Sequence, residues 1–111
     1  MSKYKLYIKD ILRSIDQIEK SLKSKTRNYF EKDIDMSEAT AMRLQIIGES
    51  IKKLPNSIKR QNPEIDWDSF IKFRNIISHV YFKIDKDILW DIIKNEIPKL
   101  KITMKRIEDE Q

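Results

Sequence analysis

The segment from Arg74 to Tyr81 places an anion binder, a titratable base and a phenol within about two helical turns. An arginine presents planar N–H donors that can bind a phosphate and stabilise negative charge on its oxygens. His79 is the only histidine of the chain, and its imidazole could take a proton from a 2′-hydroxyl or give one to a leaving 5′-oxygen. These residue types suit cleavage of an RNA phosphodiester.

The solitary histidine restricts the mechanism, because one imidazole cannot ordinarily supply both the acid and the base of a reaction. A homodimer that brings two copies of Arg74 and His79 together would supply the second proton carrier. The sequence has no cysteine and no carboxylate or histidine cluster with convincing metal-ligand spacing, which favours a route without metal or cofactor. The same residues near a helix end are also typical of a solvated or capping set.

Helical spacing divides the segment into two rows. At about 100° per residue, Arg74, Ser78 and Tyr81 line one edge of the helix. Asn75 and His79 lie one turn apart on the adjoining, more exposed strip, where Asn75 could orient the imidazole. Arg74 and His79 are about 140° apart, so they converge on one ligand only through the reach of the arginine or a distorted helix end.

Composition predicts one all-α domain spanning residues 1–111. One glycine and three prolines are too few turn formers for an all-β fold, whereas 40% hydrophobic and 37% charged residues suit helices with narrow apolar stripes. The start of the chain resembles no signal peptide, and no apolar run could span a bilayer, which predicts a cytoplasmic protein. A net charge of +5 favours a polyanionic partner such as RNA.

The first two helices follow from hydrophobic periodicity. One is expected from Tyr4 to about Lys25, with apolar residues every three or four positions. The next is expected from Asp35, which has capping-box spacing with Glu38, to about Leu54. The sequence 26–34 between them breaks the period, and we expect a short helical turn there that holds its two aromatic residues, Tyr29 and Phe30, against the core.

The second helix carries two neighbouring apolar rows: Ala39, Met42 and Ile46 in one, and Leu44, Ile47, Ile51 and Leu54 in the other. A stripe this wide suggests contact with two surfaces, either two helices or one helix and a partner chain. Gly48 lies in mid-helix, where glycine costs about 1 kcal/mol relative to alanine. Close approach of another backbone could offset that cost.

The remaining helices have recognisable starts. Asp66 can cap a third helix that runs from Trp67 to about Tyr81. Asp85 can cap the last helix, which Pro98 should kink because proline removes one backbone hydrogen bond. We therefore expect an antiparallel bundle of four principal helices with a short extra helical turn.

The order of these features resembles the HepT-like toxins of the HEPN superfamily. The signature is Arg74-x4-His79-x-Tyr81, with Asn75 directly after the arginine. Further segments fall in the expected order around it: Asp10-Ile11-Leu12, Ile46-Ile47-Gly48-Glu49, Pro63-Glu64-Ile65 followed by Trp67, and Trp90. The resemblance covers nearly the whole chain. The sequence departs from the family pattern at Ser50 and Asp66, and neither position belongs to the proposed chemistry.

The resemblance implies a HEPN-type helical bundle that dimerises around the motif, alone or within a larger hetero-oligomer. It implies a metal-independent endoribonuclease toxin with Arg74 and His79 at its active site, supported by Asn75 and Ser78. It further implies a nucleotidyltransferase antitoxin of the MNT class that attaches AMP to the Tyr81 hydroxyl. The added phosphate would compete with RNA for the same cation.

Two alternatives belong to other functional classes. One is a non-catalytic HEPN subunit that binds a nucleotide or RNA through Arg74 and serves as the partner of a nucleotidyltransferase. The other is a purely structural helical dimer, in which substitution of Arg74 would change neither RNA binding nor toxicity.

Overall fold

The computed structural model describes residues 4–79 and 85–110, with side chains described up to residue 73 in the first of these ranges. Its elements are all helical: α1 (Tyr4–Leu22), α2 (Arg27–Lys32), α3 (Ile34–Lys52), α4 (Asn56–Gln61), α5 (Trp67–His79), α6 (Lys86–Asp91), a π-helical turn η1 (Ile92–Glu96) and α7 (Ile97–Asp109). The described part of the chain contains no strand, which confirms the predicted all-α class.

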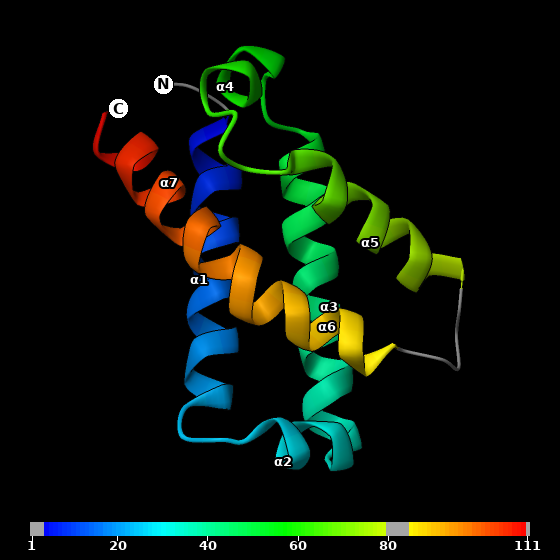
Figure 1. The fold of residues 1–111 in the computed structure, drawn as a ribbon. Helices are drawn as coiled ribbons and strands as arrows, with labels where there is room; N and C mark the ends of the chain where they lie inside the picture. Colours follow the sequence, from blue (N-terminus) through cyan, green and yellow to red (C-terminus); the bar gives the residue numbers. More distant parts are fainter. Residues whose placement is uncertain (1–3, 80–84, 111) are drawn as a thin grey trace.

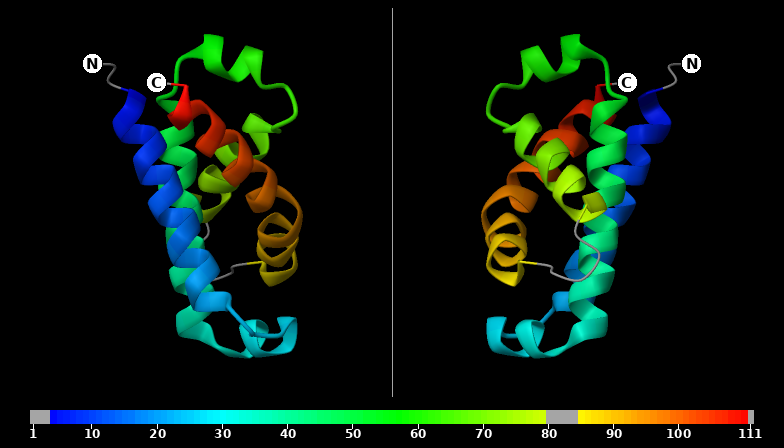
Figure 2. Two further views of the ribbon diagram at one scale, coloured as in Figure 1. Left: turned by 90° about the vertical axis from the view of Figure 1, so that its left-hand side faces the viewer. Right: turned by 90° about the vertical axis from the view of Figure 1, so that its right-hand side faces the viewer.

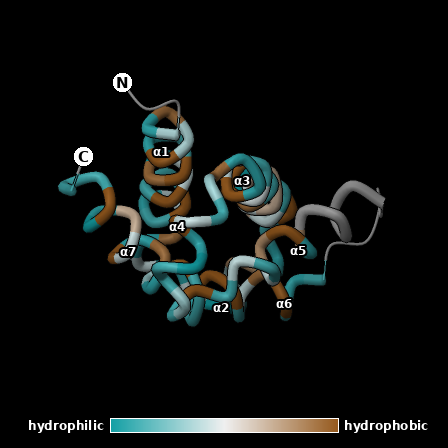
Figure 3. Tube along the Cα trace, turned by 90° about the horizontal axis from the view of Figure 1, so that it is seen from above, coloured by the Kyte–Doolittle hydropathy of each residue, from teal (hydrophilic) through white to brown (hydrophobic). Residues whose placement is uncertain are grey.

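The two longest helices, α1 and α3, lie side by side, joined at one end of the molecule through α2 (Figure 1). Helix α5 packs against α3, and α7 packs against α1. Helix α6 leads through η1 into α7, so that these three form one bent rod across the pair (Figure 2). Seen from above, α2, α6 and α7 lie on one side of the α1–α3 pair (Figure 3).

The predicted stripe of α1 forms one side of the core. Ile8, Ile11, Ile15 and Ile18 are buried, and Tyr4 and Leu22 pack at its edges. The helix ends at Leu22, three residues before the predicted end. Ser24 has φ 62°, a left-handed conformation that cannot continue a right-handed helix.

The start of α3 differs from the prediction. Asp33, not Asp35, is the N-cap, and its carboxylate accepts a hydrogen bond from the Met36 backbone N–H at 3.0 Å. Asp35 lies in the first turn, where a negative charge is favourable beside the helix dipole. The helix therefore begins at Ile34, immediately after α2.

The short segment before α3 is also helical, and its two aromatic residues differ in how far they are buried. Phe30 is fully buried and its ring lies 5.4 Å from that of Trp90. Tyr29 is 46% exposed, so the prediction that both residues pack against the core is wrong for Tyr29. Thr26 caps α2 by accepting a hydrogen bond from the Tyr29 backbone N–H at 3.1 Å. The residue after the capped turn, Phe30, is the one that anchors α2.

The last predicted helix is interrupted by the π-helical turn η1 rather than bent at Pro98 itself. In a regular helix the N–H of residue 98 would bond to the carbonyl of Lys94, and proline has no N–H. The Ile97 N–H bonds instead to the carbonyl of Ile92, five residues earlier. Pro98 then occupies the first turn of α7, where a missing N–H costs little. Within the described residues, no helix has the length and apolar character needed to cross a membrane.

Candidate functional site

The structure places Arg74, Asn75, Ser78 and His79 together in the second half of α5. The prediction that these four residues share one helix is confirmed. Tyr81 lies outside the described residues, as do the side chains of positions 74–79. Contacts among these side chains therefore stay predictions.

The first turn of α5 is held by a cap and by a buried tryptophan. The Asp66 carboxylate accepts a hydrogen bond from the Ser69 backbone N–H at 3.2 Å, which confirms the predicted N-cap. The Trp67 indole N–H donates to the carbonyl oxygens of Lys59 and Asn62, each at 3.1 Å. These bonds tie the start of α5 to the end of α4.

The body of α5 is held against α3 by apolar side chains. Ile65, Phe70 and Phe73 are buried in the core shared with α3. Phe73 directly precedes Arg74, so the rotation of the helix is fixed up to the start of the motif. By helical register, positions 75 and 79 then fall roughly opposite the two buried phenylalanines. The exposure of the Asn75 and His79 side chains themselves stays a prediction.

A polar network fixes the α4–α5 connection to α7. The buried Asn62 amide donates to the Ile58 carbonyl at 2.8 Å, and its oxygen accepts from the Arg106 guanidinium. Arg106 also donates to the Glu64 carboxylate at 3.0 Å, as does the Thr103 hydroxyl. The backbone N–H of Glu64 itself, and then these two donors, hold the pKa of Glu64 below its ordinary value. The network joins residues about forty positions apart, which the sequence did not signal.

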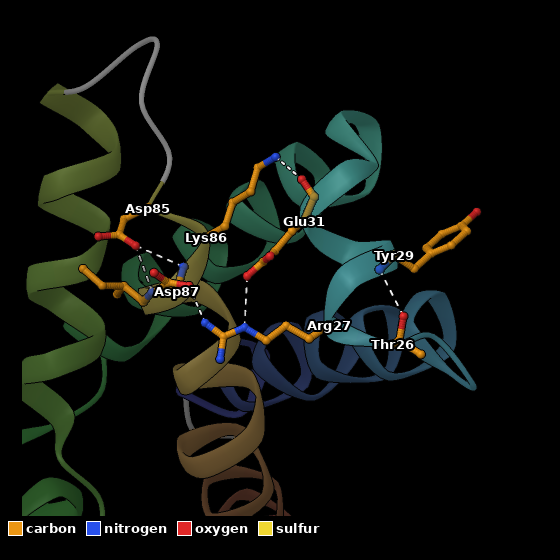
Figure 4. Close-up of polar contacts among 8 residues, drawn as sticks. Thr26, Arg27, Tyr29, Glu31, Asp85, Lys86 and Asp87 are labelled. Atoms are coloured by element: carbon orange, nitrogen blue, oxygen red, sulfur yellow. Dashed lines mark hydrogen bonds and ion pairs between the residues drawn. The ribbon is translucent and has the colours of Figure 1, made fainter.

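Helix α6, which begins directly after Asp85, is fixed to α2. Asp85 caps α6 by accepting from the backbone N–H groups of Asp87 and Ile88 at 3.0 and 3.1 Å, which confirms the predicted cap. Arg27 in α2 pairs with Asp87 and, at 3.0 Å, with Glu31 (Figure 4). Hydrogen bonds from Arg27 to Glu31 and Asp87 raise its pKa further. The segment that carries Tyr81 thus connects two anchored helices.

The two apolar rows predicted for α3 separate into a buried row and an exposed row. Leu44, Ile47, Ile51 and Leu54 lie in the core, and Gly48 is buried beside them. In the other row Met42 is 58% exposed and Ile46 is 40% exposed, whereas Ala39 is half-buried. The row formed by Met42 and Ile46 therefore remains available for contact with another surface.

Among the side chains that the structure describes, in residues 4–73 and 85–110, no group of three or more Asp or Glu residues is arranged to bind a metal ion. The anion-binding and proton-transfer chemistry expected of this site rests on α5 alone, on the Arg74 guanidinium and the His79 imidazole.

A family model described as "Ribonuclease HepT-like" matches residues 11–107, which include the whole Arg74–Tyr81 segment. A protein of Methanocaldococcus jannaschii named "Gamma-glutamylcyclotransferase and putative RNase" is 37% identical over 106 residues, which cover 96% of this chain and 48% of that protein. The chain thus spans about half the length of that relative.

Two further relatives match over most of their own length. The "Probable ribonuclease HepT" of Thermococcus cleftensis is 37% identical over 98 residues, covering 88% of this chain and 89% of that protein. A "Putative RNase" of Caldanaerobacter subterraneus is 30% identical over 101 residues, covering 91% and 90%. No solved structure matches the chain at comparable significance.

Proposed function

This chain belongs to the ribonuclease HepT-like family, and from that premise we propose that it is the metal-independent endoribonuclease toxin of a toxin–antitoxin pair in the cytoplasm. The proposal treats residues 1–111 as one HEPN domain. The observation that carries it is that Arg74 and His79 share one helix, α5, whose start and body are fixed by Trp67 and Phe73. The names of the relatives support RNA as the substrate.

In the proposed reaction the 2′-oxygen of a ribose attacks the adjacent phosphorus, and the bond to the 5′-oxygen breaks. One imidazole takes the proton of the 2′-hydroxyl, and a second gives a proton to the leaving 5′-oxygen. Arg74 stabilises the charge that develops on the phosphate oxygens. Asn75 orients the imidazole of His79 from one turn away, and Ser78 supports Arg74 on the neighbouring edge.

The second imidazole comes from a second copy of the chain. The exposed row of α3, Met42 and Ile46, supports a homodimer, because contact with another copy would remove these apolar side chains from water. Helix α5 packs directly on α3, so a dimer across α3 joins two copies of the helix that supports the motif. We therefore propose a cleavage site that is shared between two protomers.

The proposed control device is Tyr81, the last residue of the motif. An MNT-type nucleotidyltransferase antitoxin would transfer AMP from ATP to the Tyr81 hydroxyl with release of pyrophosphate. The attached phosphate would place negative charge beside Arg74 and His79, where the RNA phosphate has to bind. Co-expression with an active antitoxin should add the mass of AMP to the wild-type protein and not to Tyr81→Phe. Full inhibition of Tyr81→Phe by the antitoxin would show that control does not need this hydroxyl.

The proposed activity is tested by incubating purified protein with single-stranded RNA in EDTA. We expect the wild type to cut the RNA, and His79→Ala and Arg74→Ala to lose about a hundredfold or more of the rate. Lys72→Ala is the matched control, since it removes an exposed cation from the same helix. Equal cleavage by the wild type and His79→Ala would remove His79 from the mechanism. Binding without cleavage would favour the non-catalytic alternative.

A further inference from the structure

The corner between α1 and α2 combines exposed cations with an exposed aromatic ring. We call the residues Lys23, Lys25, Tyr29 and Lys32 the α2 corner. The Lys25 ammonium lies 4.5 Å from the centre of the Tyr29 ring, and the three lysines are exposed. Figure 4 shows the Tyr29 ring pointing away from the contacts that Arg27 makes with Glu31 and Asp87. One face of the ring can therefore meet a planar ligand while Lys25 covers the other.

A shallow groove of about 560 Å³ lies at this corner, with Tyr29, Lys32 and Ile34 among its lining residues. Ile34 is an exposed apolar side chain, so the groove offers an apolar wall as well as a cation. A groove with an aromatic ring, an apolar wall and a charged rim suits an unstacked base joined to phosphates.

The carboxylates nearby leave the corner positive. Glu31 is paired with Arg27, and the Asp33 carboxylate is engaged in capping α3. Asp35 lies exposed at the groove, so the α2 corner sets three lysines, Lys23, Lys25 and Lys32, against the carboxylates of Asp33 and Asp35. Among the described residues, Lys23 and Lys32 have no carboxylate partner. Their charge is available to an anion from solution.

The α2 corner is linked to the end of α5. The Lys86 ammonium donates to the Glu31 carbonyl, and Arg27 pairs with Asp87, so α2 and the start of α6 form one assembly. Only residues 80–84 separate His79 from Asp85, which limits the distance between their Cα atoms to roughly 22 Å. A single strand bound at His79 therefore lies within about 22 Å of the start of α6, which its contacts with Arg27 and Glu31 join to α2.

We propose that the α2 corner binds single-stranded RNA beside the cleaved bond, with Tyr29 stacked on a base and Lys23, Lys25 and Lys32 contacting phosphates. RNA fits this surface better than a protein partner does, because lysine is depleted at the centres of protein interfaces. Every base offers a face for stacking, so the corner adds affinity with little sequence preference. This inference rests on the proposed ribonuclease function and adds a substrate-binding surface to it.

The test measures binding of the full chain to a fluorescein-labelled single strand of 2′-O-methyl ribonucleotides, which lacks the attacking 2′-hydroxyl. Tyr29→Ala should weaken binding about tenfold, and Tyr29→Phe should bind like the wild type because it keeps the ring. Removal of Lys23, Lys25 and Lys32 together should lower the slope of log Kd against log salt concentration by about 2. The matched control replaces three exposed lysines elsewhere, Lys9, Lys99 and Lys105, with alanine.

The outcomes separate this inference from the proposed function. Suppose that the wild type cuts RNA, and that Tyr29→Ala and the triple-lysine variant bind RNA with unchanged Kd and salt slope. This result would overturn the proposed RNA binding at the α2 corner and leave the ribonuclease proposal standing. Equal weakening by the two triple-lysine variants would also overturn it, because the effect would then come from net charge. A wild type that neither binds nor cuts RNA would overturn both proposals. Unchanged circular dichroism of each variant would show that the fold is retained.

Discussion

Ile46 and Ile47 are neighbours in α3, yet one is 40% exposed and the other is fully buried. Ile47 belongs to the row that packs into the core with Leu44 and Ile51, whereas Ile46 lies with Met42 on the outer side. The same helix therefore offers two apolar surfaces of similar chemistry. The inner row stabilises the protomer by removing its side chains from water. The outer row gains that stabilisation only if another surface covers it.

The largest expected effect is on the inner row. Ile47→Ala should lower the free energy of unfolding by about 2–5 kcal/mol, because it leaves a cavity in a packed core. Ile46→Ala, its matched control one position away, should cost less than about 1 kcal/mol. Urea unfolding followed by circular dichroism, at one protein concentration, measures both. Similar losses for the two variants would contradict the assignment of the rows.

A smaller effect is expected at Gly48, which is buried in the middle of the same helix. Alanine should gain about 1 kcal/mol in helix propensity, but its methyl group has to fit a packed interior, which costs about 1–3 kcal/mol. We expect Gly48→Ala to be destabilising overall. A variant that is more stable than the wild type in thermal unfolding would show that no close approach requires glycine here.

The N-cap of α3 is expected to have a smaller effect on the free energy of unfolding. Asp33→Ala removes the side chain that caps the helix and should lower the free energy of unfolding by about 1 kcal/mol. Asp35→Ala should cost less, since Asp35 only interacts with the helix dipole from the first turn. Equal denaturation midpoints for the two variants would argue against Asp33 as the cap.

The smallest effect should appear in the pH dependence of stability. The inner row of α3 holds the body of α5, but the connection into α5 depends on Glu64 and Arg106. The pKa of Glu64 is lowered in the folded protein, so its contribution is present above the unfolded pKa of about 4.3 and is lost as the pH falls through the folded value. The Tm difference between wild type and Glu64→Gln should therefore shrink below about pH 4. A difference that stays constant down to pH 3 would exclude this linkage.

Periodicity was enough to predict the helices because each apolar stripe packs on a neighbour. The stripe of α1 and the inner row of α3 are buried as expected. Local competition was harder to predict. Asp33 and Asp35 can each cap a helix, and only the end of α2 selects Asp33. Likewise Tyr29 and Phe30 are neighbouring aromatic residues in a segment without a clear hydrophobic period, and only Phe30 faces the core.

In the candidate site, too, some features could be predicted from the sequence and others could not. The motif could be placed on one helix from spacing alone, and the structure confirms that positions 74, 75, 78 and 79 share α5. The Asp66 cap of that helix could also be predicted, but the polar network beside its start could not. Asn62 and Arg106 meet only after the chain has folded back through three further helices, and no local pattern in the sequence encodes that contact. Long-range polar contacts depend on tertiary structure rather than on spacing.

The shared cleavage site is tested most directly by placing charges on the outer row of α3. Met42→Asp combined with Ile46→Asp should give a folded monomer that does not cut RNA in EDTA, because two buried carboxylates would oppose the contact between copies. Leu6→Asp combined with Ile102→Asp is the matched control, since these exposed apolar residues lie on α1 and α7. Light scattering and the cleavage assay should show an active dimer for the wild type and the control. A monomeric outer-row variant with wild-type cleavage, or a variant that remains an active dimer, would contradict a site shared across α3.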